Sequence, residues 1–218
     1  MATSPIHMDG LQYLISKIEN MNAKYFRNLG WAQLSGRWTP AALFTLVYMA
    51  ISIAAGSLTG PFVCLVSLLL FPMSYSYSVA FLDDKRSASE FKIEQLFDGY
   101  KDFLRIMGTM LLTEVYIVLW TLLLIVPGVI KAISYSQTQF ILKDCPELSY
   151  NEAIERSMAM MEGHKMQYFL MALSFIGWIL LAIISCGILS LWVNPYISAT
   201  NAHFYEYVKG EYEKRITA

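Results

Sequence analysis

The residues best suited to chemistry in this sequence are two ionisable side chains within apolar stretches. Glu114 interrupts the apolar run 106–126, and Lys131 lies in the run that continues to residue 142. A carboxylate about eight residues into a membrane helix lies roughly 12 Å deep, where it is costly unless it is neutral, paired or hydrated. Glu114 is therefore a candidate proton or cation site. The alternative is a protonated side chain hydrogen-bonded to a neighbouring hydroxyl or to the backbone.

Polar side chains also gather toward the ends of three apolar segments, near residues 74–78, 134–139 and 194–203. Polar groups at membrane depth usually face the bundle interior or a water-filled cavity, so the three ends together would line a vestibule open to the cytoplasm. The alternative is that they hydrogen-bond between helices. The candidate intramembrane polar site comprises Glu114, Lys131, Ser76, Ser136, Gln137, Asn194 and Asn201.

Sequence patterns of catalysis are missing. There is no Ser/His/Asp set, phosphate-binding loop, HExxH or paired-carboxylate motif, and the three cysteines form no CxxC. His7, His164 and His203 lack the spacing of metal ligands. We therefore expect no enzymatic activity, no cofactor and no metal site. Because no isolated basic patch occurs, we also expect no nucleic-acid partner.

Composition points to a membrane protein. Charged residues make up 15% of the chain, against about 25% in soluble domains. Residues 38–82 and 166–205 contain no Asp, Glu, Lys or Arg, and one crossing needs about 20 residues. Each stretch can therefore cross twice, and residues 106–142 would form a third pair. A soluble all-α protein is less favoured, since its helices would show a charged face.

This pattern predicts an all-α polytopic membrane protein with six transmembrane helices as three hairpins, each preceded by a cytoplasmic amphipathic helix. The expected single domain, 1–218, has an interfacial helix (1–37) and a first hairpin (38–82). An amphipathic helix with a second hairpin (87–142) and an amphipathic helix with a third hairpin (149–207) follow. The N-terminal helix could lie on the leaflet or pack beneath the bundle, and the sequence favours neither.

Charge distribution predicts the orientation. If both ends and the loops 83–105 and 143–165 share one side, every Lys and Arg except Lys131 lies there. The positive-inside rule makes that side cytoplasmic. We expect a multi-pass protein of the bacterial inner membrane with both termini in the cytoplasm. The N-terminus lacks the early apolar run of a cleavable signal.

Glycines recur at nearly equal intervals before each hairpin, at Gly36, Gly99 and Gly163. We predict that each lets the chain turn from a surface helix into a crossing, because glycine reaches positive φ without steric cost. Ordinary helix stops without a common role are the alternative. Pro127 and Gly128 are the expected turn of the second hairpin. Capping boxes are predicted at residues 87–90 and 149–152.

Five sequence words carry a resemblance to a known family: LFDGYKDF (96–103), LLIVPGVIKAISYSQTQFIL (123–142), DCPELSYNEAIERSMAMMEGHK (144–165), LSFIGWILL (173–181) and LWVNPYISATNAHFYE (191–206). With LSGRW (34–38), they make the chain similar to the bacterial membrane proteins of domain-of-unknown-function family 975. The resemblance implies a six-helix integral membrane protein and no reaction. A more distant similarity is to the membrane domain of some glycerophosphodiester phosphodiesterases, which has a similar Pro-Gly hairpin.

Two classes of function follow. The first is a non-enzymatic scaffold or a module that interacts with lipid or a partner, since amphipathic helices recur and catalytic motifs are missing. The alternative is a small transporter or channel that uses the polar vestibule and Glu114. The expected partners are the lipid bilayer and a membrane or cytoplasmic protein, and the oligomeric state is left open.

Overall fold

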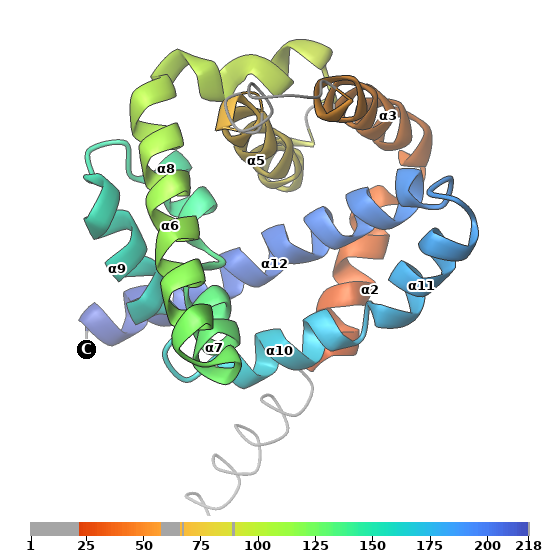
Figure 1. Ribbon diagram of the computed structural model, residues 1–218. Coiled ribbons are helices and arrows are strands. Elements are labelled where there is room, and N and C mark those ends of the chain that lie inside the picture. The colour runs from red at the N-terminus through yellow and green to blue at the C-terminus, as the bar shows by residue number, and fades with distance from the viewer. Residues whose placement is uncertain (1–21, 58–65, 67, 89, 218) are drawn as a thin grey trace, which may run out of the picture.

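The computed structural model describes residues 22–57, 66, 68–88 and 90–217, and these form helices without strands (Figure 1). The all-α prediction is confirmed. The first half contains α2 (Ala23–Leu34), α3 (Trp38–Gly56), α5 (Phe71–Ser87), the 3-10 helix η1 (Ile93–Asp102) and α6 (Phe103–Leu123). The second half contains α7 (Ile125–Tyr135), α8 (Thr138–Asp144), α9 (Tyr150–Met160), α10 (Lys165–Leu173), α11 (Ile176–Ile184) and α12 (Ser190–Thr217).

Three stretches of the described residues are long and apolar enough to cross a membrane: Trp38–Gly56, Ile93–Leu123 and Lys165–Ile184. They contain the first helix of each expected hairpin, which we call the outgoing helix. The second helix of each hairpin is the returning helix. The sequence predicted six such helices, and the three returning segments do not meet this criterion. α5 is only 17 residues long, α7 is only 11, and the 28-residue α12 carries many polar side chains. Part of the first returning segment, 58–65 and 67, lies outside the described residues.

The returning helices α5 and α12 lie toward the centre of the molecule, whereas α7 lies at its edge and is partly exposed (Figure 1). α12 crosses its middle, with α3, α6, α10 and α11 around the periphery (Figure 1). Phe81, Phe140 and Phe204, one from each returning segment, are almost completely buried. The outgoing helices are largely exposed instead, up to 79% at Leu122 and 78% at Ile184. Polar residues in the returning helices therefore lie mostly inside the bundle.

The N-terminal helix α2 packs against the bundle and does not lie apart from it. Phe26 is fully buried and meets Phe204 of α12 edge-to-face, with ring centroids 5.1 Å apart. A Cβ added to Gly30 would lie 2.4 Å from Thr200 Oγ1, so this glycine permits the close approach of α2 and α12. Of the two arrangements considered for the N-terminal helix, residues 23–34 therefore adopt the one in which the helix packs against the bundle. Residues 1–21 of the expected interfacial helix lie outside the described residues.

The recurring glycines differ in conformation. Gly36 and Gly163 have φ of +79° and +83° and stand between consecutive helices, α2 and α3, and α9 and α10. Gly99 lies inside η1, so the chain does not turn there as the sequence predicted. A Cβ at Gly99 would lie 2.3 Å from the Pro72 carbonyl oxygen. Gly99 is therefore a close-packing residue between η1 and α5, which sequence spacing alone could not distinguish from a hinge.

The turn after α6 also falls elsewhere than predicted. Leu124 is the extended residue that separates α6 from α7. Pro127 lies within the first turn of α7, where its missing N–H costs no helical hydrogen bond. Gly128 is buried against Thr121 of α6, whose Oγ1 would lie 2.2 Å from an added Cβ. The Pro-Gly pair thus starts the returning helix and lets it approach α6.

Only one of the two predicted capping boxes is present. At the start of α9, the Glu152 carboxylate accepts hydrogen bonds from the Ser149 backbone N–H (2.8 Å) and hydroxyl (2.6 Å). The expected box at residues 87–90 is absent, because α5 continues through Ser87. The capping box there is formed instead by Lys92 and Gln95, and the Lys92 backbone N–H donates to Gln95 at 2.9 Å.

Candidate functional site

 Glu114 lines a cleft of about 210 Å³. A separate cleft of about 290 Å³ lies at the charged end of the molecule and is lined by Ser76. The Glu114 cleft lies between α6, the junction of α7 and α8, and α10. Its wall consists of Met110, Thr113, Glu114, Ile117, Ala132, Tyr135, Ser136, Thr138, Gln139 and Tyr168.

A break between two helices supplies one wall of the Glu114 cleft. α7 ends at Tyr135 and α8 begins at Thr138. Ser157 of α9 stabilises the break, because its hydroxyl donates to the Ser134 carbonyl (2.8 Å) and accepts from the Gln137 N–H (3.3 Å). A broken helix inside a bundle is tolerated when other groups satisfy its backbone in this way.

Two buried side chains at this break have polar atoms without a hydrogen-bond partner. They are Thr138 Oγ1 and Gln137 Oε1, in residues that are 2% and 0% exposed. Thr138 lines the cleft, and Gln137 lies beside it. A buried polar atom without a partner is unfavourable, so its presence calls for a specific explanation.

The other polar groups of the cleft differ in what they can still bind. Thr113 donates its hydroxyl proton to the Thr109 carbonyl (2.8 Å). Ser136 donates to the Ile133 carbonyl (2.8 Å) and accepts from Gln137 Nε2 (2.8 Å). Glu114 is exposed and forms no hydrogen bond or ion pair with the part of the chain that the structure describes. The cleft therefore offers the hydroxyl oxygens of Thr113 and Thr138 and one carboxylate as acceptors, together with the Gln139 amide, which can donate or accept.

Lys131 lies beside the cleft but does not line it. Its Nζ is 5.0 Å from the ring centroid of Trp120, 5.8 Å from that of Tyr135, and 3.6 Å from Met158 Sδ. Aromatic faces attract a cation electrostatically. These contacts of Lys131 do not involve Glu114, so the two ionisable side chains lie in separate surroundings.

The remaining residues of the predicted polar site lie in other places. Ser76 connects α5 to η1, because its hydroxyl donates to the Pro72 carbonyl (2.8 Å) and accepts from the Gly99 N–H (2.7 Å). Asn194 Nδ2 lies 3.8 Å from Met49 Sδ, and Asn201 is half-buried in α12. The described residues that line the Ser76 cleft and the Glu114 cleft have no member in common. The expected shared vestibule is therefore not formed by these two polar segments.

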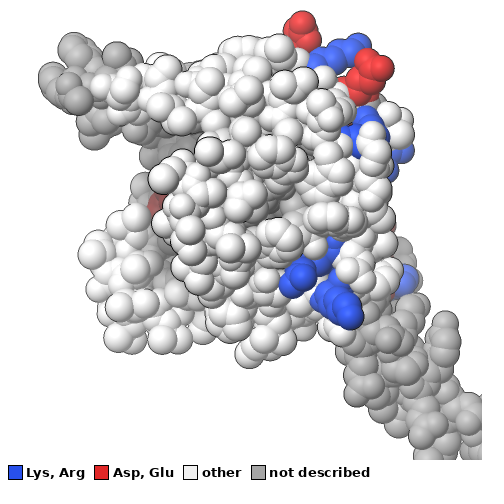
Figure 2. Space-filling model, turned by 90° about the vertical axis from the view of Figure 1, so that its right-hand side faces the viewer, with Lys and Arg blue, Asp and Glu red and all other residues white. Residues whose placement is uncertain are grey.

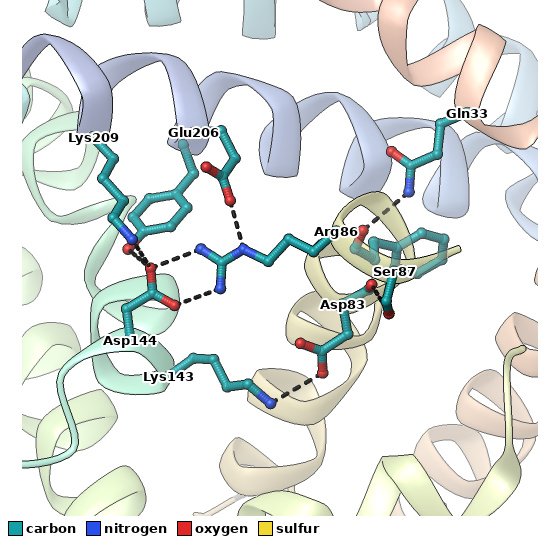
Figure 3. Close-up of polar contacts among 10 residues, drawn as sticks. Gln33, Asp83, Arg86, Ser87, Lys143, Asp144, Glu206 and Lys209 are labelled. Carbon is teal, nitrogen blue, oxygen red and sulfur yellow. Dashed lines mark hydrogen bonds and ion pairs between the residues drawn. The ribbon is translucent and has the colours of Figure 1, made fainter. Parts of the chain in front are cut away.

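Sequence reasoning missed a charged cluster centred on Asp144, at the end of α8 (Figure 3). Arg86 Nη1 and Nη2 donate to the two oxygens of Asp144 at 2.6 and 2.7 Å, while its Nε donates to Glu206 at 2.6 Å. Lys209 Nζ (2.7 Å) and the Tyr205 hydroxyl (2.8 Å) also donate to Asp144. The cluster thereby joins the ends of α5 and α8 to α12.

Hydrogen bonding determines the ionisation of this cluster. Burial by itself would raise the pKa of Asp144, but the hydrogen bonds from Arg86, Lys209 and Tyr205 outweigh it and hold that pKa well below its usual range. The same contacts raise the pKa of the Arg86 guanidinium, against the effect of its own burial. Asp144 is therefore a carboxylate at neutral pH.

A signal for the cluster was present in the sequence. Each returning segment is followed by charges of both signs, at residues 83–86, 143–144 and 206–209. Figure 2 shows most of the visible Lys, Arg, Asp and Glu toward one side of the face, with a small acidic patch on the other side. The sequence did not show which of these charges pair with each other, because partners up to 120 residues apart cannot be matched from one sequence.

A second buried carboxylate fixes the N-terminal helices. Asp84 of α5, whose side chain is 1% exposed, pairs with Arg37 and accepts a hydrogen bond from Gln33 Nε2 at 2.7 Å. Within the described residues, no group of three or more His, Cys, Asp or Glu is placed to hold a metal ion. The charged end is therefore arranged as ion pairs that connect helices, while the Glu114 cleft contains unpaired groups.

Comparison with known proteins gives a family match over the C-terminal part of the chain. Residues 122–212 match the family described as protein of unknown function (DUF975). The words at 34–38 and 96–103 lie outside this match, and the similarity to phosphodiesterase membrane domains stays a prediction. Searches of curated proteins and of solved structures found no match. Residues 122–212 of this chain are thus similar to the DUF975 family, as the sequence words in that region predicted.

Proposed function

We propose that this chain is a multi-pass membrane protein that serves as a non-enzymatic module for contact with lipid or with a partner protein. In this proposal three hairpins cross the bilayer, and the charged end faces the cytoplasm. The observation that carries it is the division between outer helices, which are apolar and exposed, and inner helices, which are polar and buried. A water-soluble bundle has the opposite distribution.

The exposed apolar side chains support this placement. Leu122 and Ile184 lie at the far ends of outgoing stretches and are 79% and 78% exposed. Contiguous apolar surface of this kind is unfavourable in water and marks contact with a membrane or a partner. In this proposal, water and lipid headgroups surround the rim of the ion-paired cluster around Asp144.

Native cysteines provide a sharp test of the orientation. Cys186 is exposed at the turn between α11 and α12, and Cys145 is half-buried next to Asp144 at the charged end. In intact cells of a bacterial host, an impermeant maleimide should label a variant that retains only Cys186. A cysteine-free variant carrying Lys92→Cys should be labelled only after lysis. Strong labelling at position 92 in intact cells would refute the proposed topology.

A second candidate function is transport of a small solute, and the Glu114 cleft favours it. The cleft combines an unpaired carboxylate with a helix break, and discontinuous helices often form binding sites in transporters. The two candidates differ in a measurable way. A transporter reconstituted in vesicles moves a solute that its cleft binds, whereas a module does not.

A further inference from the structure

We propose that the Glu114 cleft binds a primary ammonium group, carried by a short alkyl chain or by the ethanolamine headgroup of a lipid. The inference deepens the second candidate function, but it requires only binding and not transport. Charge is the first reason. Glu114 brings a carboxylate, and none of the ten lining residues is Lys, Arg or His.

Hydrogen bonding is the second reason. The protons of Thr113 and Ser136 are committed to backbone carbonyls. Thr138 Oγ1 is buried and has no partner. An ammonium group has three donors and no acceptor, which matches the hydroxyl oxygens of Thr113 and Thr138 beside the Glu114 carboxylate. A donor from the ligand would also satisfy Thr138.

Size and shape are the third reason. The cleft measures about 210 Å³, whereas one water molecule has a share of roughly 30 Å³ in the liquid. A bare inorganic ion would leave most of this space to water. Met110, Ile117 and Ala132 form an apolar part of the wall, which suits a short alkyl chain. The ring of Tyr168 offers an aromatic face, which attracts an ammonium group.

Lys131 sets a limit on the ligand. Its ammonium group already lies against the rings of Trp120 and Tyr135, and Tyr135 also lines the cleft. A second cation is therefore favoured close to Glu114 and disfavoured at the Tyr135 end. The alkyl chain is expected to point toward Tyr135, with the ammonium group at Glu114 and Thr138.

The test is thermal unfolding of the detergent-purified full-length chain with n-propylammonium chloride. We expect a saturable rise in Tm, because a ligand that binds only the folded state stabilises it. Sodium chloride at equal ionic strength and the neutral n-propanol should give no such rise. An equal rise with sodium chloride would mean an inorganic cation site and would overturn the proposal.

A lipid arm distinguishes the two sources of the ammonium group. In nanodiscs, phosphatidylethanolamine in place of phosphatidylcholine should raise Tm and weaken the response to n-propylammonium if the headgroup occupies the cleft. If the ligand is a free amine, the response should be the same in both lipids. Absence of a response in detergent and in both lipids would overturn the proposal.

Two variants and a control localise the binding. Glu114→Gln should abolish the Tm rise with n-propylammonium, and Thr138→Val should weaken the apparent affinity at least threefold. Glu147→Gln, a change at an exposed carboxylate outside the cleft, should respond as the wild type does. If Glu114→Gln does not fold, Thr138→Val decides, and an unchanged affinity there overturns the proposal. The topology test does not depend on these results, so the two failures are distinguishable.

Discussion

Replacing Asp144 by Asn should weaken the connection of three helix ends. The carboxylate accepts hydrogen bonds from Arg86 of α5 and from Tyr205 and Lys209 of α12. Asparagine has nearly the same shape but carries no charge, and its amide nitrogen cannot accept a hydrogen bond. The variant would leave the positive charges of Arg86 and Lys209 without their shared partner, close to each other.

The size of the effect follows from burial. Removing one partner of a fully buried ion pair costs about 3–5 kcal/mol. The Asp144 side chain is 9% exposed, but those of Arg86 and Lys209 are 33% and 30% exposed, and Arg86 keeps its pair with Glu206. Solvent therefore screens part of the loss. We expect the free energy of unfolding to fall by about 2–3 kcal/mol, which lowers Tm by roughly 5–10 °C.

Thermal unfolding of the purified protein in one detergent checks this expectation. The matched control is Asp98→Asn, which removes an exposed carboxylate paired with Lys101 between side chains that are 50% and 81% exposed. Such a pair contributes about 0–1 kcal/mol. If Asp144→Asn and Asp98→Asn lower Tm equally, the reasoning that assigns a structural role to the Asp144 cluster is refuted.

The difference between wild type and Asp144→Asn should also depend on pH. Because the folded pKa of Asp144 lies below its usual value, the carboxylate stabilises the folded state fully at pH above about 5. The stabilisation decreases as pH falls below about 4 and Asp144 becomes protonated in the unfolded state first. The Tm gap between the two proteins should therefore narrow between about pH 5 and pH 3, while a constant gap would contradict the ionised contact.

Three further substitutions test the packing of the helices. Gly99→Ala should lower the free energy of unfolding by about 2–3 kcal/mol, since its Cβ would lie 2.3 Å from the Pro72 carbonyl oxygen. Gly163→Ala has open space but a φ of +83°, so it should cost about 1–2 kcal/mol of backbone strain. Ser157→Ala leaves the Ser134 carbonyl and the Gln137 N–H without their partner and should cost about 1–3 kcal/mol. Thermal unfolding in the same detergent measures all three.

Controls separate these causes from a general effect of substitution. Gly56→Ala adds a Cβ with no atom within 4 Å and no positive φ, so its Tm should stay close to that of the wild type. Gly163→Asn should recover part of the loss of Gly163→Ala, since asparagine tolerates the left-handed conformation better. Ser52→Ala removes a hydroxyl whose hydrogen bond among the described residues lies within its own helix, to the Tyr48 carbonyl. A loss equal to that of Ser157→Ala would contradict the role of Ser157 at the break.

In this chain, sequence patterns predict the helices better than they predict the contacts between the helices. The all-α class and the positive φ of Gly36 and Gly163 agree with expectations drawn from apolar runs and from glycine spacing. Gly99 fits the same spacing but is a packing residue. The atom that its Cβ would clash with belongs to α5, in another part of the chain. Spacing identifies a glycine that matters, and only the fold distinguishes a turn from a close approach.

The break between α7 and α8 could not be predicted for a related reason. Residues 134–139 are polar, but Pro and Gly are missing there, and these are the usual helix breakers. The break depends on Ser157 of α9, which satisfies the freed backbone groups from outside the segment. The candidate polar residues Glu114 and Ser136 do line one cleft, whereas Ser76 lines another and Asn194 contacts α3.

The polarity of the returning helices follows from their central position. An outgoing helix that exposes most of its surface to lipid must be apolar all round. A returning helix surrounded by other helices can carry hydroxyls and amides, provided that each finds a partner. Most do, as Thr45 and Tyr77 show with a hydrogen bond of 2.9 Å between α3 and α5. The groups that find none are therefore the informative ones. Thr138 meets that criterion beside the unpaired carboxylate of Glu114, and this coincidence favours binding at that cleft over simple contact between helices.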